Sequence, residues 1–363
     1  MDVPQTPLHS EHARLGASFT DFGGWDMPVR YTSDLAEHEA VRTDAGLFDI
    51  SHMAEIFVTG DNAAEFLDFA LVIQCSAIAN GKAKYSLICN EAGTIIDDLI
   101  VYRLADDQFL VIANAGNRMP VVEALKTRAT EFGFTGIEDK SDDFALLAVQ
   151  GPNATAKLQN LTETDLSTLP YYSIAEGKVD GVAGYFCRTG YTGEDGFEVL
   201  IPAENAVQVF NALLNLGIQA CGLASRDTLR LEAGMPLYGH ELTLDINPYQ
   251  AGLGRVVKLD KPDNFVGKSA LESISKTEVS PVLVGLVGTG KRAARADYEI
   301  FSKDNNLIGQ ITSGALSPTL GYPVAMAYVA KEFSELGTEV EVDIRGTRLT
   351  MTVVKLPFYK RSK

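Results

Sequence analysis

The chain has 363 residues, of which 46% are hydrophobic, and its mean hydropathy is +0.02. This length exceeds one ordinary domain and suffices for two or three domains with sizeable cores. The net charge of −17 argues against duplex DNA or an anionic membrane as a partner, although a local arginine cluster could still hold a small anion.

The hydropathy pattern predicts a soluble protein, and the cysteine usage described below predicts a cytoplasmic one. No apolar run approaches the roughly 20 residues of a membrane span. The N-terminal stretch Met-Asp-Val-Pro-Gln-Thr-Pro has neither a basic start nor an apolar core, so we expect no signal or transit peptide.

The cysteines and histidines predict neither a disulfide framework nor a metal site. Cys75, Cys89, Cys187 and Cys221 are scattered and form no Cys-x-x-Cys pair, which favours reduced core thiols. The five histidines show no metal-ligand spacing. His52, in Asp-Ile-Ser-His-Met, is interpreted as a buried histidine with satisfied hydrogen bonds rather than as a catalyst.

Helical and strand patterns alternate over the first two thirds of the chain. Apolar residues at helical spacing, bounded by capping residues and glycines, predict helices at 35–43, from 61 or 62 onward, at 121–132, from 153 or 155 onward, at 203–216, and at 225–232 with Ser225 as the cap. Alternating or continuous apolar runs predict strands at 55–59, within 84–113, at 144–150 and at 197–201.

The texture changes beyond about residue 259. Short β-runs broken by Gly, Asn and Pro occur at 282–287, 298–302, 308–312, 324–329, 340–344 and 349–354. Regular strand spacing with few helices predicts a β-barrel or a β-sandwich for this part of the chain.

Residues 189–199, Thr-Gly-Tyr-Thr-Gly-Glu-Asp-Gly-Phe-Glu-Val, predict a glycine-rich loop followed by a strand. Phe197, Val199 and Ile201 share one face of that strand, and Glu198 interrupts the apolar run on the other. A carboxylate there lies either in water at a sheet margin or buried with donors aimed at it. The local sequence leaves both possibilities open.

Residues 93–102 predict a strand that carries two adjacent carboxylates on opposite faces, Asp97 and Asp98. Partial burial would raise the pKa of at least one of them and let it handle protons near neutrality. Asn114, at the end of the following strand, could return to the level of the pair, and Tyr85 lies on the preceding strand. The alternative is a solvated pair at the start of a strand.

Arg226 and Arg230 are spaced to share one face of a short helix. Because Arg226 lies in the first turn, its charge opposes the helix dipole and suits a carboxylate or a ligand. Ion pairing with Asp227 or Glu232 is the alternative. The chain shows no nucleophile elbow, phosphate loop or dinucleotide motif, and this set of groups suits binding an organic cofactor and moving protons around it.

Six stretches together carry a family resemblance. They are residues 41–53, 96–101, 149–153, 189–194, 226–235 and 311–314. In this order they closely resemble aminomethyltransferases, the T-proteins of the glycine cleavage system, and the match runs from about residue 6 to the C-terminus.

The resemblance implies an α+β protein with three lobes around a central folate channel. Two α+β lobes with antiparallel sheets would be followed by a C-terminal β-barrel. Residues 1–48 and 142–250 would form a discontinuous first lobe, residues 49–141 an inserted second lobe, and residues 251–363 the barrel lobe.

The resemblance also implies the reaction. The lipoyl arm of the H-protein delivers an aminomethyl group, tetrahydrofolate accepts the carbon as methylenetetrahydrofolate, and ammonia and dihydrolipoyl H-protein leave. A carboxylate can accept both adjacent N–H donors of the amino-pyrimidinone edge of a reduced pterin. No metal, nucleic acid or membrane is expected to take part.

By the same resemblance, Asp98 is the catalytic acid, chosen over Asp97 by motif alignment because strand alternation alone does not decide. Arg295, in a basic cluster with Arg292, would contact the glutamate tail of folate or the partner protein, with a solvated loop as the alternative. The implied substrate- and folate-binding residues are Tyr85, Tyr102, Asn114, Tyr191, Glu198, Arg226, Tyr238 and Arg295.

Two other functions stay open at this point. Relatives of the same fold take one-carbon units from methylated amines or a sulfonium compound, and another branch acts as a folate-binding assembly factor. That branch typically carries a distinct cysteine-containing signature, which is not found here, and Asp98 and Asn114 argue against it.

Overall fold

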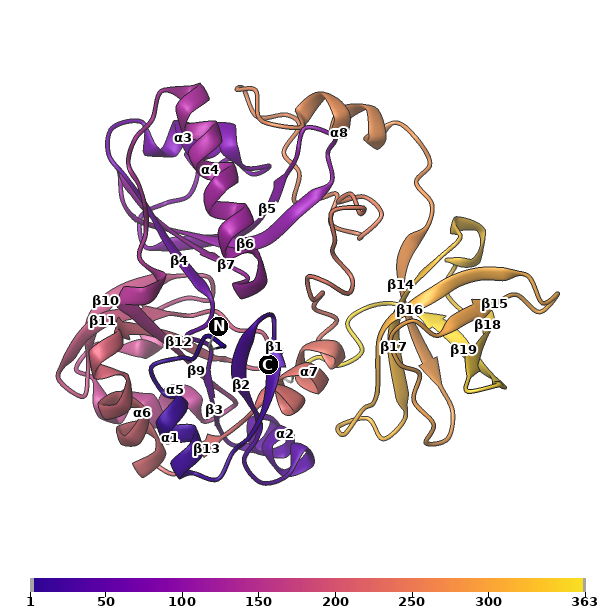
Figure 1. Ribbon diagram of the computed structural model, residues 1–363, viewed down its shortest axis with the longest axis horizontal. Coiled ribbons are helices and arrows are strands. Elements are labelled where there is room, and N and C mark those ends of the chain that lie inside the picture. Colours follow the sequence, from indigo (N-terminus) through magenta and orange to yellow (C-terminus); the bar gives the residue numbers. More distant parts are fainter. Residues whose placement is uncertain (1–2, 362–363) are drawn as a thin grey trace.

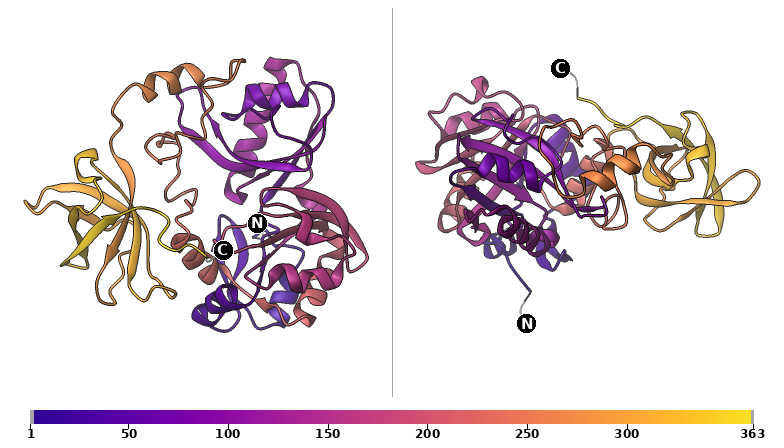
Figure 2. Two further views of the ribbon diagram at one scale, coloured as in Figure 1. Left: turned by 180° about the vertical axis from the view of Figure 1, so that it is seen from behind. Right: turned by 90° about the horizontal axis from the view of Figure 1, so that it is seen from above.

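The computed structural model describes residues 3–361, which form two α+β lobes and a separate barrel (Figure 1). Seen from above, the barrel extends away from the two stacked lobes as a third body (Figure 2). The expected α+β class with antiparallel sheets and a C-terminal barrel is confirmed.

The first lobe contains a six-stranded sheet in the order β10-β11-β12-β9-β3-β13, antiparallel except for the parallel pair β13 and β3. Its strands are β3 (Gly46–Asp49), β9 (Phe144–Gln150), β10 (Ile174–Val179), β11 (Val182–Cys187), β12 (Gly196–Pro202) and β13 (Gln219–Ala220). A hairpin of β1 (Ser18–Phe22) and β2 (Trp25–Arg30) lies beside it. Its helices are α1 (His9–Arg14), α2 (Asp34–Thr43), α5 (Ala154–Leu158), α6 (Ala206–Asn215) and α7 (Leu223–Glu232).

The second lobe contains a five-stranded antiparallel sheet in the order β5-β6-β7-β4-β8. Its strands are β4 (Ala54–Thr59), β5 (Lys82–Cys89), β6 (Ile95–Ala105), β7 (Gln108–Ala113) and β8 (Ile137–Asp139). Helices α3 (Ala63–Ala70) and α4 (Arg118–Phe132) cover one face of this sheet (Figure 1).

The barrel closes in the order β14-β17-β16-β15-β18-β19. Its strands are β14 (Val282–Gly288), β15 (Glu299–Phe301), β16 (Leu307–Leu316), β17 (Pro323–Val329), β18 (Glu339–Ile344) and β19 (Thr347–Val354). All six short β-runs anticipated in the sequence belong to this barrel. The structure thus has a closed barrel rather than a sandwich, and closure leaves no strand edge unpaired.

The expected boundary between the first lobe and the barrel at residue 251 stays a prediction, and the chain that connects these two lobes runs over the second lobe. Ala251, Val257, Phe265 and Leu271 belong to the apolar core of the second lobe, and the first barrel strand begins only at Val282. Helix α8 (Lys268–Ser275) lies in this connection. These residues are too apolar to remain in solvent, so the connection packs on the nearest sheet.

The beginning of α7 corrects one sequence expectation. The N-cap residue is Gly222, and Ser225 donates its hydroxyl to the Gly222 carbonyl from inside the first turn. A β-carbon at Gly222 would lie 2.4 Å from the Val29 carbonyl carbon, so the close approach of strand β2 selects glycine here. The predicted cap at Ser225 is therefore wrong by one turn.

An apolar layer joins the inner faces of the two sheets. It includes Phe48 of β3, Tyr102 of β6, Ile112 of β7 and Leu146 of β9, all at most 7% exposed. This layer holds the two sheets against each other, and the site described below lies near the beginnings of β6 and β12. The four cysteines are free and buried, as expected.

Candidate active site

A cavity of about 310 Å³ lies between the two lobes and the start of α7. Its wall combines the first half of β6, the glycine-rich loop before β12, and α7, with apolar residues such as Ile100 and Leu146 between the polar ones. Such a mostly apolar hollow with a few convergent polar groups is typical of a site for an organic ligand.

The two carboxylates of β6 have different positions in the wall. Asp98 lines the cavity, and its oxygens accept hydrogen bonds from the Tyr85 hydroxyl at 3.0 Å and from Asn114 Nδ2 at 2.8 Å. Asp97 is fully buried and accepts from the backbone N–H of Asn114 at 2.9 Å, from Asn114 Nδ2 at 2.9 Å and from Asn117 Nδ2 at 2.6 Å. Asn114 therefore bridges the two acids, as the sequence suggested.

Burial raises the pKa of both acids. It raises the pKa of Asp97 to about 8, with the neighbouring charge of Asp98 adding to the effect, and the pKa of Asp98 to about 6. The donors that oppose this shift, Tyr85, Asn114 and Asn117, are all neutral. Near neutral pH the pair can therefore hold a proton that two ordinary carboxylates would have lost, and it can exchange that proton.

Glu198 of β12 forms the opposite wall. It pairs in register with Ala148 and Cys187 and is 8% exposed. Thr189 donates to Glu198 Oε2 at 2.6 Å, and the Tyr102 hydroxyl lies 2.7 Å from the Thr189 hydroxyl. The carboxylate is thus buried with donors aimed at it, which decides between the two possibilities that the sequence left open.

The glycine-rich loop brings Tyr191 to the cavity. Gly190 passes so close to Gln150 that a β-carbon would lie 1.9 Å from the amide oxygen. The Tyr191 hydroxyl donates to the Pro236 carbonyl at 2.5 Å. Arg42 of α2 holds the loop from behind by donating to the Thr192 carbonyl at 2.7 Å.

Arg226 reaches the cavity from the first turn of α7. Its guanidinium carbon lies 5.0 Å from the centre of the Tyr191 ring and 5.8 Å from that of Phe48. Its Nη1 atom is enclosed and has no hydrogen-bond partner within residues 3–361. Within the described part of the chain, the alternative ion pair of Arg226 with Asp227 or Glu232 is not formed; Asp227 pairs with Arg230, and Glu232 pairs with Arg42.

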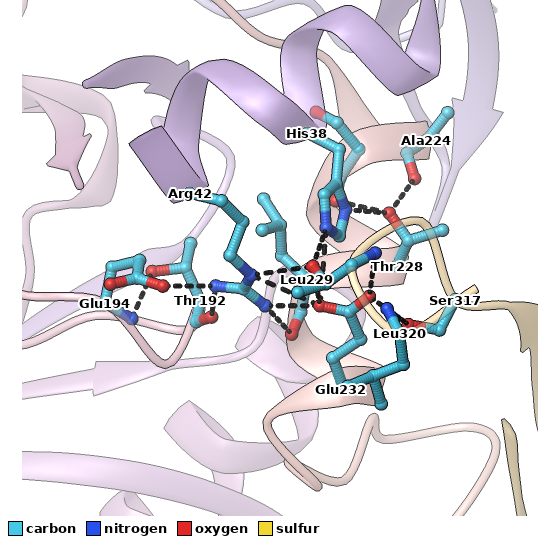
Figure 3. Close-up of polar contacts among 12 residues, drawn as sticks. His38, Arg42, Thr192, Glu194, Ala224, Thr228, Leu229, Glu232, Ser317 and Leu320 are labelled. Atoms are coloured by element: carbon cyan, nitrogen blue, oxygen red, sulfur yellow. Dashed lines mark hydrogen bonds and ion pairs between the residues drawn. The ribbon is translucent and has the colours of Figure 1, made fainter. Parts of the chain in front are cut away.

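Glu232, at the end of α7, is surrounded by donors (Figure 3). Arg42 Nη2 lies 2.8 Å and His38 Nε2 3.3 Å from Glu232 Oε2. Ser317 and Thr319, on a loop of the barrel, donate their hydroxyls to its two oxygens. This cluster joins α2, α7 and the barrel behind the glycine-rich loop.

Six residues predicted for the site line the cavity, and three do not. The lining residues are Tyr85, Asp98, Asn114, Tyr191, Glu198 and Arg226. Tyr102 lies behind the wall and contacts Thr189, Tyr238 donates to the Ile95 carbonyl at 3.2 Å, and Arg295 is on the surface, where it donates to the Gly314 carbonyl. The roles of all nine in binding or catalysis stay predictions.

His52 was missed as a site residue. It lines the cavity and is 3% exposed, as expected for a buried histidine, but its Nδ1 atom has no hydrogen-bond partner in the part of the chain that the structure describes. The prediction that it is satisfied is therefore wrong. The only sequence signal was its place in the 41–53 stretch that carries the family resemblance.

Comparisons with known proteins agree with this architecture. Residues 8–261 match the model of the GCVT N-terminal domain, and residues 282–360 match that of the glycine cleavage T-protein C-terminal barrel domain. Aminomethyltransferases from Saccharopolyspora erythraea and Streptomyces coelicolor are each 52% identical to the chain, with 99% and 100% of the chain and 98% and 99% of the relatives covered. The crystal structure of glycine cleavage system aminomethyltransferase T from Bartonella henselae superposes with a TM-score of 0.94 at 38% identity, covering 99% of both chains.

Fold and relatives define a transferase of the aminomethyltransferase class. The chain belongs to the glycine cleavage T-protein family and functions as the aminomethyltransferase of the glycine cleavage system. Within residues 3–361, no helix is both long and apolar enough to cross a membrane, and no group of three potential metal-ligating acids, histidines or cysteines is found.

Proposed function

We propose that the chain moves the methylene carbon of the aminomethyl group on the lipoyl arm of an H-protein to tetrahydrofolate within the cavity between its lobes. The observation that carries the proposal is the position of Glu198 and Asp98 as opposite polar groups of one cavity. The products are methylenetetrahydrofolate, ammonia and dihydrolipoyl H-protein.

Glu198 is the group that we assign to the pterin ring. An ionised carboxylate only accepts hydrogen bonds, and the amino group and ring N–H of a reduced pterin offer two parallel donors. One of its oxygens already accepts from Thr189, which Tyr102 in turn contacts. Tyr102 thereby supports the binding group from behind, and Tyr191 contributes its ring to the same wall.

Asp98 is the group that we assign to the proton transfer. Two new carbon–nitrogen bonds to folate replace the bonds of the carbon to sulfur and to the amino nitrogen. The two folate amines each release a proton, and the departing ammonia and thiol each gain one. Asp98, with a pKa raised by burial to about 6, is ionised at neutral pH and can accept a proton and pass it on.

Tyr85 and Asn114 hold Asp98 in place through hydrogen bonds of 3.0 and 2.8 Å. Because both donors are neutral, they orient the carboxylate without removing its affinity for a proton. No covalent intermediate with the protein is required, which agrees with the absence of a nucleophile motif in the sequence.

We place the reaction in the cytoplasm. The four buried free cysteines support this, because unpaired thiols are typical of reducing compartments.

The test is an assay of ammonia and methylenetetrahydrofolate formed from tetrahydrofolate and H-protein loaded with an aminomethyl group. We expect both products in equal amounts. Methyl transfer from methylated amines or a sulfonium compound, without these products, would assign the chain to another branch of the fold. Folate binding with no turnover of any of these donors would indicate an assembly factor instead.

A further inference from the structure

His52 lines the cavity but has no role in the proposed transfer reaction. It follows β3 in the turn before β4, and its ring packs edge-on to Phe22 at a centroid distance of 5.7 Å. Burial lowers the pKa of His52 to about 4, so the ring is neutral at pH 7. A neutral imidazole carries one N–H and one lone pair, and leaving either unpaired in a buried site costs free energy.

Arg226 shares this condition. Its Nη1 atom is enclosed in the same wall and lacks a partner among the residues described, although it belongs to a different element. A guanidinium can only donate hydrogen bonds. Its charge is close enough to contribute to the lowered pKa of His52. Two side chains from separate elements therefore line one cavity, each with one enclosed nitrogen that is unpaired in the described part of the chain, and it is their remaining nitrogen atoms that can reach a ligand.

The surroundings of Nδ1 indicate which His52 nitrogen carries the proton. Nδ1 is enclosed by the protein and has no acceptor within residues 3–361. An unpaired buried N–H is rarer than an unpaired buried acceptor, so the proton is better placed on Nε2. His52 then offers a donor to the cavity, and so does Arg226.

These two donors complete a pattern that begins at Glu198. The carboxylate accepts, and the nearby charge of Arg226 acts on it from the side of α7. The amino-pyrimidinone edge of a pterin carries an amino group, a ring N–H and a carbonyl oxygen in sequence. Glu198 matches the first two groups, and a pair of donors matches the two lone pairs of the carbonyl oxygen.

We propose that His52 and Arg226 together bind the ring carbonyl oxygen of the pterin, which makes His52 a specificity-determining residue for 4-oxo pteridines. This inference rests on the proposed folate function and adds to it a contact that distinguishes pteridines with a carbonyl at position 4 from those without one. The carbonyl of the bound ligand would accept two hydrogen bonds, one of them from a charged donor, inside a largely apolar cavity.

The direct test is an isotope-edited infrared difference spectrum of tetrahydrofolate labelled with ¹³C at ring position 4 and bound to the full-length protein. We expect the carbonyl stretch at lower frequency than in water, because hydrogen bonds in an apolar surrounding polarise the C=O bond more strongly. In His52→Phe, which keeps an aromatic ring against Phe22 but has no donor, the stretch should move to higher frequency.

Affinity supplies the second readout. By calorimetry, His52→Phe should weaken tetrahydrofolate binding by about tenfold, the effect of losing one buried hydrogen bond to a ligand. His52→Gln is the matched control, because its amide retains a donor, and it should stay within about threefold of the unaltered protein. The third readout is NMR of the unaltered protein labelled with ¹⁵N-histidine. Ligand binding should shift the Nε2 signal of one neutral histidine. The absence of that signal in His52→Gln would assign it to His52.

The outcomes separate the two proposals. Saturable binding with a carbonyl stretch at or above its frequency in water overturns this inference and leaves the folate site standing. The same holds if His52→Phe folds and binds with an unchanged stretch and unchanged affinity, or if no histidine Nε2 signal responds to the ligand. Failure of the unaltered protein to bind tetrahydrofolate at all would overturn the proposed function as well.

Discussion

The acid pair of β6 and the carboxylate of Glu232 are both buried, but their surroundings give them opposite properties. Glu232 is held by Arg42 and His38 and by two hydroxyls, and the donors around it lower its pKa to about 2. Among residues 3–361, the donors to Asp97 and Asp98 are all neutral, and burial raises the pKa of both acids. Burial thus makes a charged carboxylate costly in both places, and the charge of the neighbouring groups decides whether its pKa is lowered or raised.

The difference separates a structural acid from a chemical one. Glu232 remains ionised across the physiological range and joins α2, α7 and the barrel (Figure 3). Asp98 remains able to exchange a proton near neutrality because it has no cationic partner among the described residues that bond to it. Four substitutions or conditions would break or sharpen this contrast.

The largest effect on stability should follow from Glu232→Gln. Removing the charge leaves Arg42 and His38 buried beside a neutral amide, and breaking a buried ion pair in this way typically costs about 3–5 kcal/mol. The free energy of unfolding from urea titration measures the effect. Glu335→Gln, at an exposed position, is the control and should change stability by less than about 0.5 kcal/mol. A similar value for both variants would show that the cluster is not structural.

Asp98→Asn should have the reverse profile. We expect turnover to fall by about 10²–10⁴, the usual effect of losing a general base, while stability near pH 7 is kept or increased because a buried charge is removed. Product formation with loaded H-protein and urea titration measure the two effects. Full turnover in a folded variant would contradict the role given to Asp98, and Asp97→Asn shows whether its neighbour shares that role.

Glu55 of β4 is a third kind of buried acid, one whose carboxylate has no hydrogen-bond donor among the described residues. It is buried beside Ile112, neither carboxylate oxygen has a hydrogen-bond partner in the described residues, and burial raises its pKa well above the usual value. A raised pKa favours the folded state only below the unfolded pKa, so stability falls as pH rises towards the folded pKa.

Glu55→Met, which replaces the acid by an apolar side chain of similar length, should therefore be more stable than the unaltered protein at pH 8 by about 1–3 kcal/mol. The gain should be smaller at pH 5, where both states of Glu55 hold more protons. Thermal unfolding at the two pH values is the measurement, and a gain independent of pH would show that Glu55 does not titrate between them.

The pH dependence of turnover should be the mildest test. Asp98 must be ionised to accept a proton, so the rate should fall about tenfold per pH unit below pH 6. The Glu232 contribution to stability has the opposite sign of shift, is fully present above pH 4.5 and is lost only as pH falls towards 2. Activity should therefore disappear well before the fold does, and simultaneous loss would contradict the assignment.

Local patterns predicted what depends on a single strand. Alternation along β12 placed Glu198 opposite its apolar neighbours, and hairpin geometry brought Asn114 back to the acid pair. The α+β class and the barrel followed from the spacing of helices and strands together with the family resemblance. The choice of Asp98 over Asp97 needed that resemblance, because alternation gives each acid a face but does not say which face meets a cavity.

Features that depend on contacts between distant segments could not be predicted in this way. Nothing local to the turn after β3 shows that His52 lacks a partner, or that Tyr102 stops behind Thr189 short of the cavity. The helix cap moved from Ser225 to Gly222 because strand β2 leaves no room for a side chain there. Several apolar residues between 251 and 271 pack on the second lobe for a similar reason, since their partners are far away in the sequence.

The barrel loop that binds Glu232 limits which relatives could supply the barrel of a chimeric protein. Ser317 and Thr319 supply hydroxyls, and Thr319 a backbone N–H, to an acid on α7, and the same acid secures Arg42 behind the glycine-rich loop. A chimera that takes its barrel from a distant relative would keep the ligand wall in shape only if the incoming loop brings equivalent donors. A chimera joined between residues 261 and 282 therefore has to keep the two hydroxyl groups of Ser317 and Thr319 that bind Glu232.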